Sequence, residues 1–281
     1  MYAAEGGKPV TVPGVRRRKG RKKLVMLTAY DTTMARLLDG AVDLLLVGDS
    51  LGCVVQGQDT TLGVTLDEMI YHSRLVARGA QRSLVIGDLP FGSYQVGSED
   101  AVRSAIRLMK EGAVGAVKLE GGVAVEDSIA RIVRAGIPVM GHIGLTPQSY
   151  HAMGGHKIQG KSRAAAERLL EDARAVERAG AFVMVIEGVP ADVAAEITAA
   201  IRIPTIGIGA GPHCDGQVLV VNDMVGLNDA AAPMRFNKEY CAVRELIREA
   251  AGSFAREVRA GAFPEARHSF RPDGIKLARG A

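Results

Sequence analysis

Eight short apolar runs recur along the 281-residue chain, and most are separated by a stretch with helical spacing. The runs are apolar throughout instead of alternating, which is typical of parallel strands covered on both faces. Eight strand–helix units in about 250 residues predict a single (β/α)8 barrel, the TIM-barrel fold. The predicted strands span residues 24–30, 43–49, 83–88, 115–122, 137–142, 181–187, 203–209 and 217–223.

An open, doubly wound sheet is the alternative fold for a chain of alternating strands and helices. Its phosphate-binding fingerprint, GxGxxG, does not follow the first predicted strand, and the IGIGAG stretch at 206–211 comes only at the seventh. A long helix from about residue 237 to 260 follows the last strand. The sequence therefore predicts a basic lead-in at 1–23 and one barrel domain at 24–281 with a C-terminal helix and tail.

Positive charge is concentrated in residues 16–23, RRRKGRKK, where seven cations occur without an acid in a chain of net charge +4. We expect a solvated segment that leads into the first strand. Contact with nucleic acid is the sharper alternative, but no interleaved aromatic residues or recognition motif support it. Contact with acidic small molecules is a third possibility, and a salt-dependent binding assay would identify a nucleic-acid-binding protein on a catalytically inactive barrel.

The three cysteines are far apart and form no CxxC pattern, so neither a zinc site nor a disulfide framework is indicated. The first residues lack the apolar core of a signal peptide, and no run approaches the ~18 apolar residues of a membrane span. We expect a cytoplasmic protein without a membrane partner.

Polar side chains stand at or just past the ends of several predicted strands, where apolar residues would otherwise continue. In a (β/α)8 barrel the loops after the strands build the active site at one end. The polar residues in these positions are Asp49, Ser50, Asp88, Lys118, Glu120, His142 and Glu187. Together they predict a site at the carboxyl end of the barrel.

Asp49, Asp88 and Glu120 follow the second, third and fourth predicted strands. Three adjacent carboxylates raise each other's pKa unless a cation lies between them. Oxygen ligands without a cysteine or a histidine pair favour Mg²⁺ or Mn²⁺ over zinc. Any one of the three acids could instead cap a loop.

Lys118 lies two residues before Glu120, so both side chains point to the same side of a strand. It could bind a substrate carboxylate or oxyanion, or form a Schiff base. His142 could donate to a substrate oxygen or hold a loop. Glu187 follows the sixth strand, away from the acids, where it could act as a general base or form a salt bridge. A metal, a cation and a detached base suggest enolisation of a 2-oxo acid, without identifying the electrophile.

Motifs over nearly the whole chain resemble the ketopantoate hydroxymethyltransferase family. They are TAYD (28–31), VGDSLG (47–52), VQGQDTTLGVT (55–65), DLPFGSY (88–94), VKLEGG (117–122), GHIGLTPQS (141–149), GGHKIQG (154–160), IGIGAG with DGQVLV (206–220) and HSF (268–270). The resemblance implies a (β/α)8 barrel of the phosphoenolpyruvate/pyruvate type that assembles as a homodecamer.

The activity implied by the resemblance is transfer of a hydroxymethyl group from 5,10-methylenetetrahydrofolate to 3-methyl-2-oxobutanoate. The product is 2-dehydropantoate, the pathway is that of pantothenate and coenzyme A, and a Mg²⁺-stabilised enolate is the intermediate. By this resemblance Asp49 and Asp88 bind Mg²⁺ and help to bind substrate, and Glu120 completes the metal shell. Ser50, Lys118 and His142 contact the oxo acid, and Glu187 accepts the proton.

The nearest rival enzymes are metal-dependent barrels of the phosphoenolpyruvate mutase and isocitrate lyase kind. Those enzymes typically carry a catalytic cysteine in a motif such as KKCGH, and no such motif occurs in this sequence.

Overall fold

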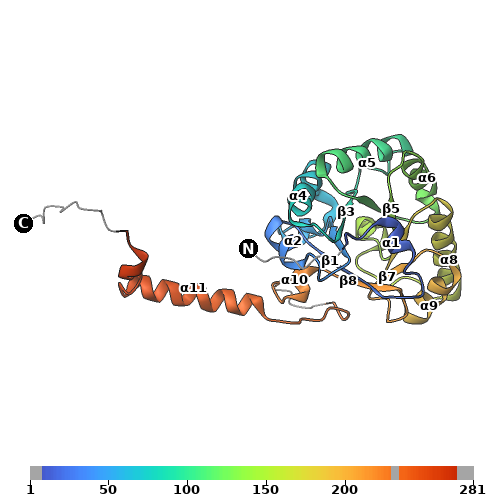
Figure 1. Ribbon diagram of the computed structural model, residues 1–281. Coiled ribbons are helices and arrows are strands. Elements are labelled where there is room, and N and C mark those ends of the chain that lie inside the picture. The colour runs from blue at the N-terminus through green and yellow to red at the C-terminus, as the bar shows by residue number, and fades with distance from the viewer. Residues whose placement is uncertain (1–7, 229–233, 271–281) are drawn as a thin grey trace, which may run out of the picture.

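The computed structural model describes residues 8–228 and 234–270 and contains the predicted closed barrel (Figure 1). Each strand pairs in parallel with the next, and the last pairs with the first, which excludes an open sheet. The predicted tail beyond residue 270 and the first seven residues of the lead-in lie outside the described residues. The strands are β1 (Leu24–Thr28), β2 (Leu44–Val47), β3 (Leu84–Asp88), β4 (Ala116–Glu120), β5 (Val139–Gly144), β6 (Val183–Glu187), β7 (Thr205–Ile208) and β8 (Gly216–Leu219).

Helices surround most of the barrel, and local sequence explains where several of them start. Asp31 accepts a hydrogen bond from the Met34 N–H at the start of α2, and Thr65 and Glu68 form a capping box at α4. The α-helices are α1 (Val12–Arg16), α2 (Thr32–Leu38), α3 (Leu51–Val54), α4 (Leu66–Gly79), α5 (Ser98–Gly112), α6 (Glu126–Arg134), α7 (Tyr150–Met153), α8 (Arg163–Arg178), α9 (Ala191–Ala200), α10 (Val221–Met224) and α11 (Val243–Arg259).

The strands separate two apolar layers, because successive side chains along a strand point to opposite faces. The barrel interior is filled by residues such as Leu24, Leu44, Ile86 and Met140. A larger cluster packs between the outer face of the strands and the helices. The core therefore fixes the direction of every side chain at the strand ends.

The N-terminal segment closes the end of the barrel at which the strands begin. Val15 of α1, a helix missed by the sequence prediction, is fully buried in the interior cluster, and in Figure 1 α1 lies in front of the strands. Lys19 Nζ lies 2.9 Å from Asp215 Oδ2 and donates to the Thr198 carbonyl at 2.6 Å. Arg18 pairs with Asp43 at 2.7 Å. Part of the basic segment is thus attached to the barrel instead of being solvated.

We expect Lys19→Met to lower the free energy of unfolding by about 1–3 kcal/mol, because Asp215 would remain buried without its cation. Lys22→Met is the matched control, since that side chain is exposed, and it should change the value by less than about 0.5 kcal/mol. Urea unfolding followed by circular dichroism measures both. Equal effects would show that the Lys19–Asp215 pair does not stabilise the fold.

Helix α11 begins at Val243, later than the predicted residue 237, and extends away from the barrel (Figure 1). None of its residues is buried, and four large apolar side chains on it are about half exposed or more. They are Leu246, Ile247, Phe254 and Val258. The C-terminal helix that the sequence predicts is therefore present, but it does not cover its own barrel.

Within residues 8–228 and 234–270, every helix is too short or too polar to cross a membrane.

Candidate active site

The polar residues lie at the carboxyl end of the barrel, directly above the apolar interior, because side chains two residues apart on a strand point to the same side. Ile86 and Met140 belong to the interior cluster, and two residues later along the same strands come Asp88 and His142. Val185 and Glu187 repeat this relation on β6, at the last position of the strand. Each polar side chain therefore points into the barrel mouth because an apolar neighbour two residues earlier points into the core.

Lys118 and Asp88 form a buried ion pair between neighbouring strands. They are register partners on β4 and β3, and Lys118 Nζ lies 2.5 Å from Asp88 Oδ1. The second Asp88 oxygen accepts the Asp49 backbone N–H at 3.2 Å. Burial lowers the pKa of Lys118, but the carboxylates of Asp88, Glu120 and Asp49 raise it by a larger amount. The net shift is upward, so the amine stays protonated. A protonated amine is a poor nucleophile, which disfavours the Schiff-base alternative.

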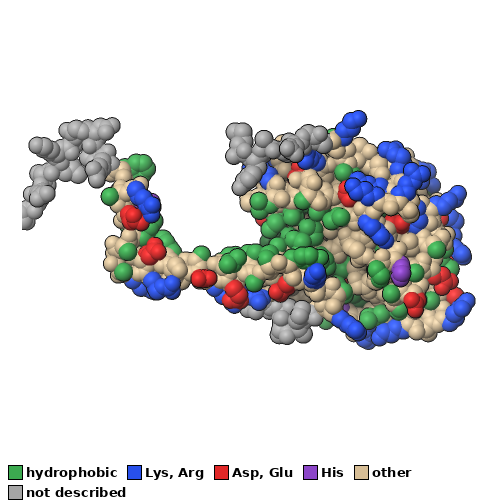
Figure 2. Space-filling model, turned by 60° about the horizontal axis from the view of Figure 1, so that its bottom comes forward, with side chains coloured by type: hydrophobic (Ala, Val, Ile, Leu, Met, Phe, Trp, Pro, Cys, Tyr) green, Lys and Arg blue, Asp and Glu red, His purple; other side chains and the backbone are tan. Residues whose placement is uncertain are grey.

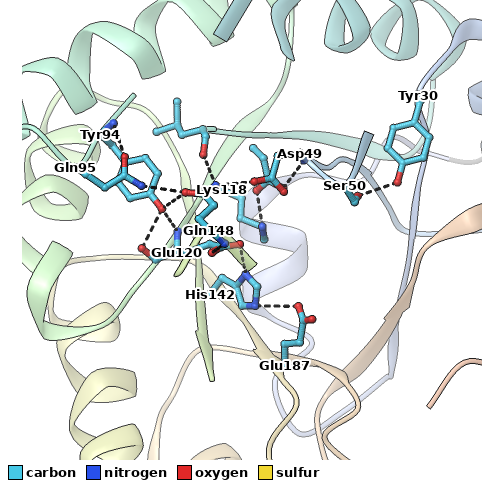
Figure 3. Close-up of polar contacts among 12 residues, drawn as sticks. Tyr30, Asp49, Ser50, Tyr94, Gln95, Lys118, Glu120, His142, Gln148 and Glu187 are labelled. Atoms are coloured by element: carbon cyan, nitrogen blue, oxygen red, sulfur yellow. Dashed lines mark hydrogen bonds and ion pairs between the residues drawn. The ribbon is translucent and has the colours of Figure 1, made fainter. Parts of the chain in front are cut away.

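His142 lies between two carboxylates (Figure 3). Its Nδ1 is 3.3 Å from Glu120 Oε1, and its Nε2 is 3.2 Å from Glu187 Oε2. Neither contact has the direction of a good hydrogen bond, so both are close ion pairs. Burial and Lys118 lower the pKa of His142, but the two carboxylates outweigh them and raise it to about 9. His142 is thus a second cation that holds Glu187 in place.

Negative charge exceeds positive charge in this site. Within the part of the chain that the structure describes, Lys118 and His142 are the cations that face the carboxyl groups of this site. The carboxyl groups are those of Asp49, Asp88, Glu120 and Glu187. Burial, Asp88 and Glu120 raise the pKa of Asp49 from 3.8 to about 8. The ring therefore lacks a positive charge beside Asp49.

A divalent cation fits this deficit, and carboxylate oxygens suit Mg²⁺. Among the described residues, no three acidic, histidine or cysteine side chains converge closely enough to hold a metal alone. Mg²⁺ is commonly held by one or two carboxylates with water and substrate oxygens in the other positions. Asp49 and Asp88 would be those carboxylates, while Glu120 contacts His142 and the Gln148 backbone N–H. The assignment of all three acids as metal ligands stays a prediction.

Ser50 begins α3 next to Asp49, and its hydroxyl lies 2.9 Å from the hydroxyl of Tyr30. Tyr30 is buried and follows β1. Any side chain at position 48 would collide with Ser50, because a Cβ on Gly48 would lie 2.7 Å from its Oγ. The sequence places a hydroxyl donor beside the acids and leaves room for it.

Two residues that bond to the acids of the site were missed by the sequence prediction, as was Tyr30 beside Ser50, although all three lie in motifs quoted above. Gln148, in the loop after β5, contacts Asp49 and Glu120, and Tyr94 bonds to Gln148 and to the Glu120 backbone. Neither carries a charge or follows a strand end directly, so no rule of spacing indicated them. All seven predicted residues, by contrast, lie in or beside this one site. Figure 3 labels each of them except Asp88.

Comparison with known proteins identifies the family. A family model for ketopantoate hydroxymethyltransferase matches residues 9–266. The chain belongs to this family. A 3-methyl-2-oxobutanoate hydroxymethyltransferase from Anaeromyxobacter sp. (strain Fw109-5) is 53% identical over 274 residues, covering 95% of this chain and 90% of the relative. One from Oleidesulfovibrio alaskensis is 56% identical over 262 residues, covering 93% and 90%.

Solved structures with the same fold are much more distant in sequence. A phosphonopyruvate hydrolase has a TM-score of 0.60 at 12% identity, with 94% of this chain and 92% of that chain covered. A phosphoenolpyruvate phosphomutase from Streptomyces platensis subsp. rosaceus has a TM-score of 0.60 at 14% identity, covering 89% and 88%. This likeness confirms the (β/α)8 fold, whereas membership of the hydroxymethyltransferase family favours that activity over the rival enzymes.

Proposed function

We propose that this protein transfers a hydroxymethyl group from 5,10-methylenetetrahydrofolate to 3-methyl-2-oxobutanoate, giving 2-dehydropantoate for pantothenate and coenzyme A synthesis. The observation that carries the proposal is the division of the site. On one side lie the cation Lys118 and the acids Asp49 and Asp88, whose negative charge is not fully balanced. On the other side, past His142, lies Glu187. Family membership supplies the choice of substrates.

In the proposed reaction Lys118, held by Asp88, binds the carboxylate of the oxo acid, and Ser50, held by Tyr30, donates to a substrate oxygen. Mg²⁺, when bound by Asp49 and Asp88, would supply the positive charge that favours enolisation. His142 neutralises charge between Glu120 and Glu187 and contacts the oxo acid.

Glu187 removes the C3 proton of the substrate in this proposal. Its side chain is 16% exposed, compared with 3% or less for those of Glu120 and Asp88, so it is the carboxylate of this group that a substrate in the mouth can reach. His142 Nε2 lies 3.2 Å from Glu187 Oε2 and fixes the orientation of this carboxylate. A general base needs this combination of access and fixed orientation.

The reaction itself is the first test. The purified protein is incubated with 3-methyl-2-oxobutanoate and 5,10-methylenetetrahydrofolate, and 2-dehydropantoate is measured by mass spectrometry with Mg²⁺ or with EDTA. We expect product that requires both substrates and falls sharply with EDTA. Absence of product from folded protein supplied with Mg²⁺ would overturn the proposed function.

We further propose a cytoplasmic homo-oligomer, in which α11 covers the barrel of another copy; the number of ten subunits comes from the family resemblance. Outer side chains of β1 and β8 line a hollow of about 570 Å³, and Val25 there is 46% exposed. Figure 2 shows a patch of hydrophobic side chains on the barrel, where the segment that leads to α11 leaves it. The apolar face of α11 and this hollow are complementary surfaces, each exposed in the single chain.

We expect the double variant Leu246→Asp with Phe254→Asp to dissociate the oligomer, since both side chains are more than half exposed on one face of α11. Arg256→Asp, which adds a carboxylate to the opposite face, is the control and should leave the assembly intact. Size-exclusion chromatography with light scattering measures the mass. A double variant with the mass of the unaltered protein would show that this face is not the contact.

A further inference from the structure

Gln148 is the most connected polar side chain at the barrel mouth. It is 6% exposed and lies in the loop after β5, where it bonds to groups on three other segments. Its Nε2 donates to Asp49 Oδ2 at 2.8 Å and to the Leu89 carbonyl at 3.0 Å. Its Oε1 accepts from the Tyr94 hydroxyl at 2.6 Å and from Gln95 Nε2 at 3.0 Å.

We propose that Gln148 is the positioning residue for Asp49, fixing that carboxylate for the divalent cation and the oxo acid. This inference rests on the function proposed above. Gln148 touches neither reacting atoms nor substrate in this proposal and acts through Asp49. A second link is its backbone N–H, which donates to Glu120 Oε2 at 3.0 Å, so that one loop holds two acids of the ring.

The surroundings of the amide allow one orientation only. The two acceptors, Asp49 Oδ2 and the Leu89 carbonyl, face the nitrogen, and two donors face the oxygen. The Tyr94 hydroxyl accepts the Glu120 backbone N–H at 3.1 Å. Its one proton faces two acceptors, the Glu120 carbonyl at 3.2 Å and Gln148 Oε1 at 2.6 Å, and the shorter distance favours Gln148. A flipped amide would turn its nitrogen toward the two donors and its oxygen toward the two acceptors, so these hydrogen bonds would be lost. The donor to Asp49 is therefore held from behind by Tyr94.

Asp49 needs such a support because of its place in the chain. Asp88 and Glu120 are the last residues of their strands and are aligned by the sheet, whereas Asp49 lies beyond β2, which ends at Val47. Its backbone N–H is bound by Asp88, but that bond does not set the direction of the carboxylate. Among the described residues, the hydrogen bond that reaches a side-chain oxygen of Asp49 comes from Gln148, so Gln148 sets the direction of this carboxylate.

Gln148→Met removes the donor and acceptor while keeping the length of the side chain. We expect the affinity for Mn²⁺, used as the probe, to fall by roughly ten- to a hundredfold, the range for losing one hydrogen bond to a charged group. Electron paramagnetic resonance of free Mn²⁺ measures binding without turnover, with and without 3-methyl-2-oxobutanoate. Gln81→Met, the same change at an exposed residue before β3, is the control and should bind as the unaltered protein does.

Tyr94→Phe provides an independent arm, which also serves if Gln148→Met does not fold. It removes the hydroxyl that holds the Gln148 oxygen and should weaken Mn²⁺ binding severalfold. In the double variant the two losses should not add, because Tyr94 is proposed to act through Gln148. Melting temperatures report folding of each variant separately.

Unchanged or tighter Mn²⁺ binding in folded Gln148→Met, or full additivity with Tyr94→Phe, would overturn the role of Gln148. Failure of the proposed function has a different signature: the unaltered protein would bind Mn²⁺ in a Gln148-dependent way and form no 2-dehydropantoate. Absence of Mn²⁺ binding by the unaltered protein, with and without the oxo acid, would overturn both.

Discussion

Asp49→Asn is expected to lower turnover by at least about a hundredfold while leaving the fold at least as stable as before. Asparagine has the same shape and can still accept the hydrogen bond from Gln148, but it carries no negative charge for a cation. Initial rates of product formation measure the loss. Asp127→Asn, the same change at an exposed position on α6, should leave the rate unaltered.

The stability part of this prediction follows from the raised pKa of Asp49. Folding raises it from 3.8 to about 8, so between these pH values the unfolded chain holds fewer protons than the folded one. Stability therefore falls as the pH rises through this interval in the metal-free protein. Asp49→Asn removes that dependence and should melt at the same or a higher temperature at pH 8 in EDTA. A lower melting temperature there, or full activity with Mg²⁺, would contradict the account of Asp49.

Glu187→Gln is expected to lower turnover by about 10²–10⁴-fold, the usual contribution of one general base. Glutamine keeps the size of the side chain and its position beside His142 but cannot accept the substrate proton. Binding of 3-methyl-2-oxobutanoate in the presence of Mg²⁺ should persist, because Lys118 and the acids of the ring are unchanged. Calorimetry measures that binding, and product formation measures the rate.

The control for this variant is Glu167→Gln on α8, an exposed residue that pairs with Arg163 away from the barrel mouth. It should retain the full rate. If Glu187→Gln loses substrate binding along with turnover, the residue holds the substrate instead of removing a proton from it.

The barrel and the ring of site residues could be predicted from sequence because both follow from the period of a strand. An apolar residue such as Ile86 fixes which way Asp88 points, and the same relation holds for Met140 and His142. The direction of a side chain along a strand can be predicted from this period without knowledge of the tertiary structure.

Gln148 could not be predicted in the same way. It is an uncharged residue in a loop, and its partners Asp49, Leu89 and Tyr94 come from distant segments that only the closed barrel brings together. The arrangement of α11 was hidden for a different reason. An amphipathic pattern shows that a helix has an apolar face, but not whether its own barrel or another surface covers that face.

Exchange of the C3 proton of 3-methyl-2-oxobutanoate with deuterated water tests the central claim most directly. Proton NMR follows it without the folate, so it reports enolisation alone. We predict exchange by the unaltered protein with Mg²⁺, little exchange in EDTA, and exchange at least about a hundredfold slower in Glu187→Gln and Asp49→Asn. Exchange near the unaltered rate in Glu187→Gln would show that another group, with His142 the first candidate, removes the proton. No exchange by the folded, unaltered protein with Mg²⁺ would contradict enolisation at this site.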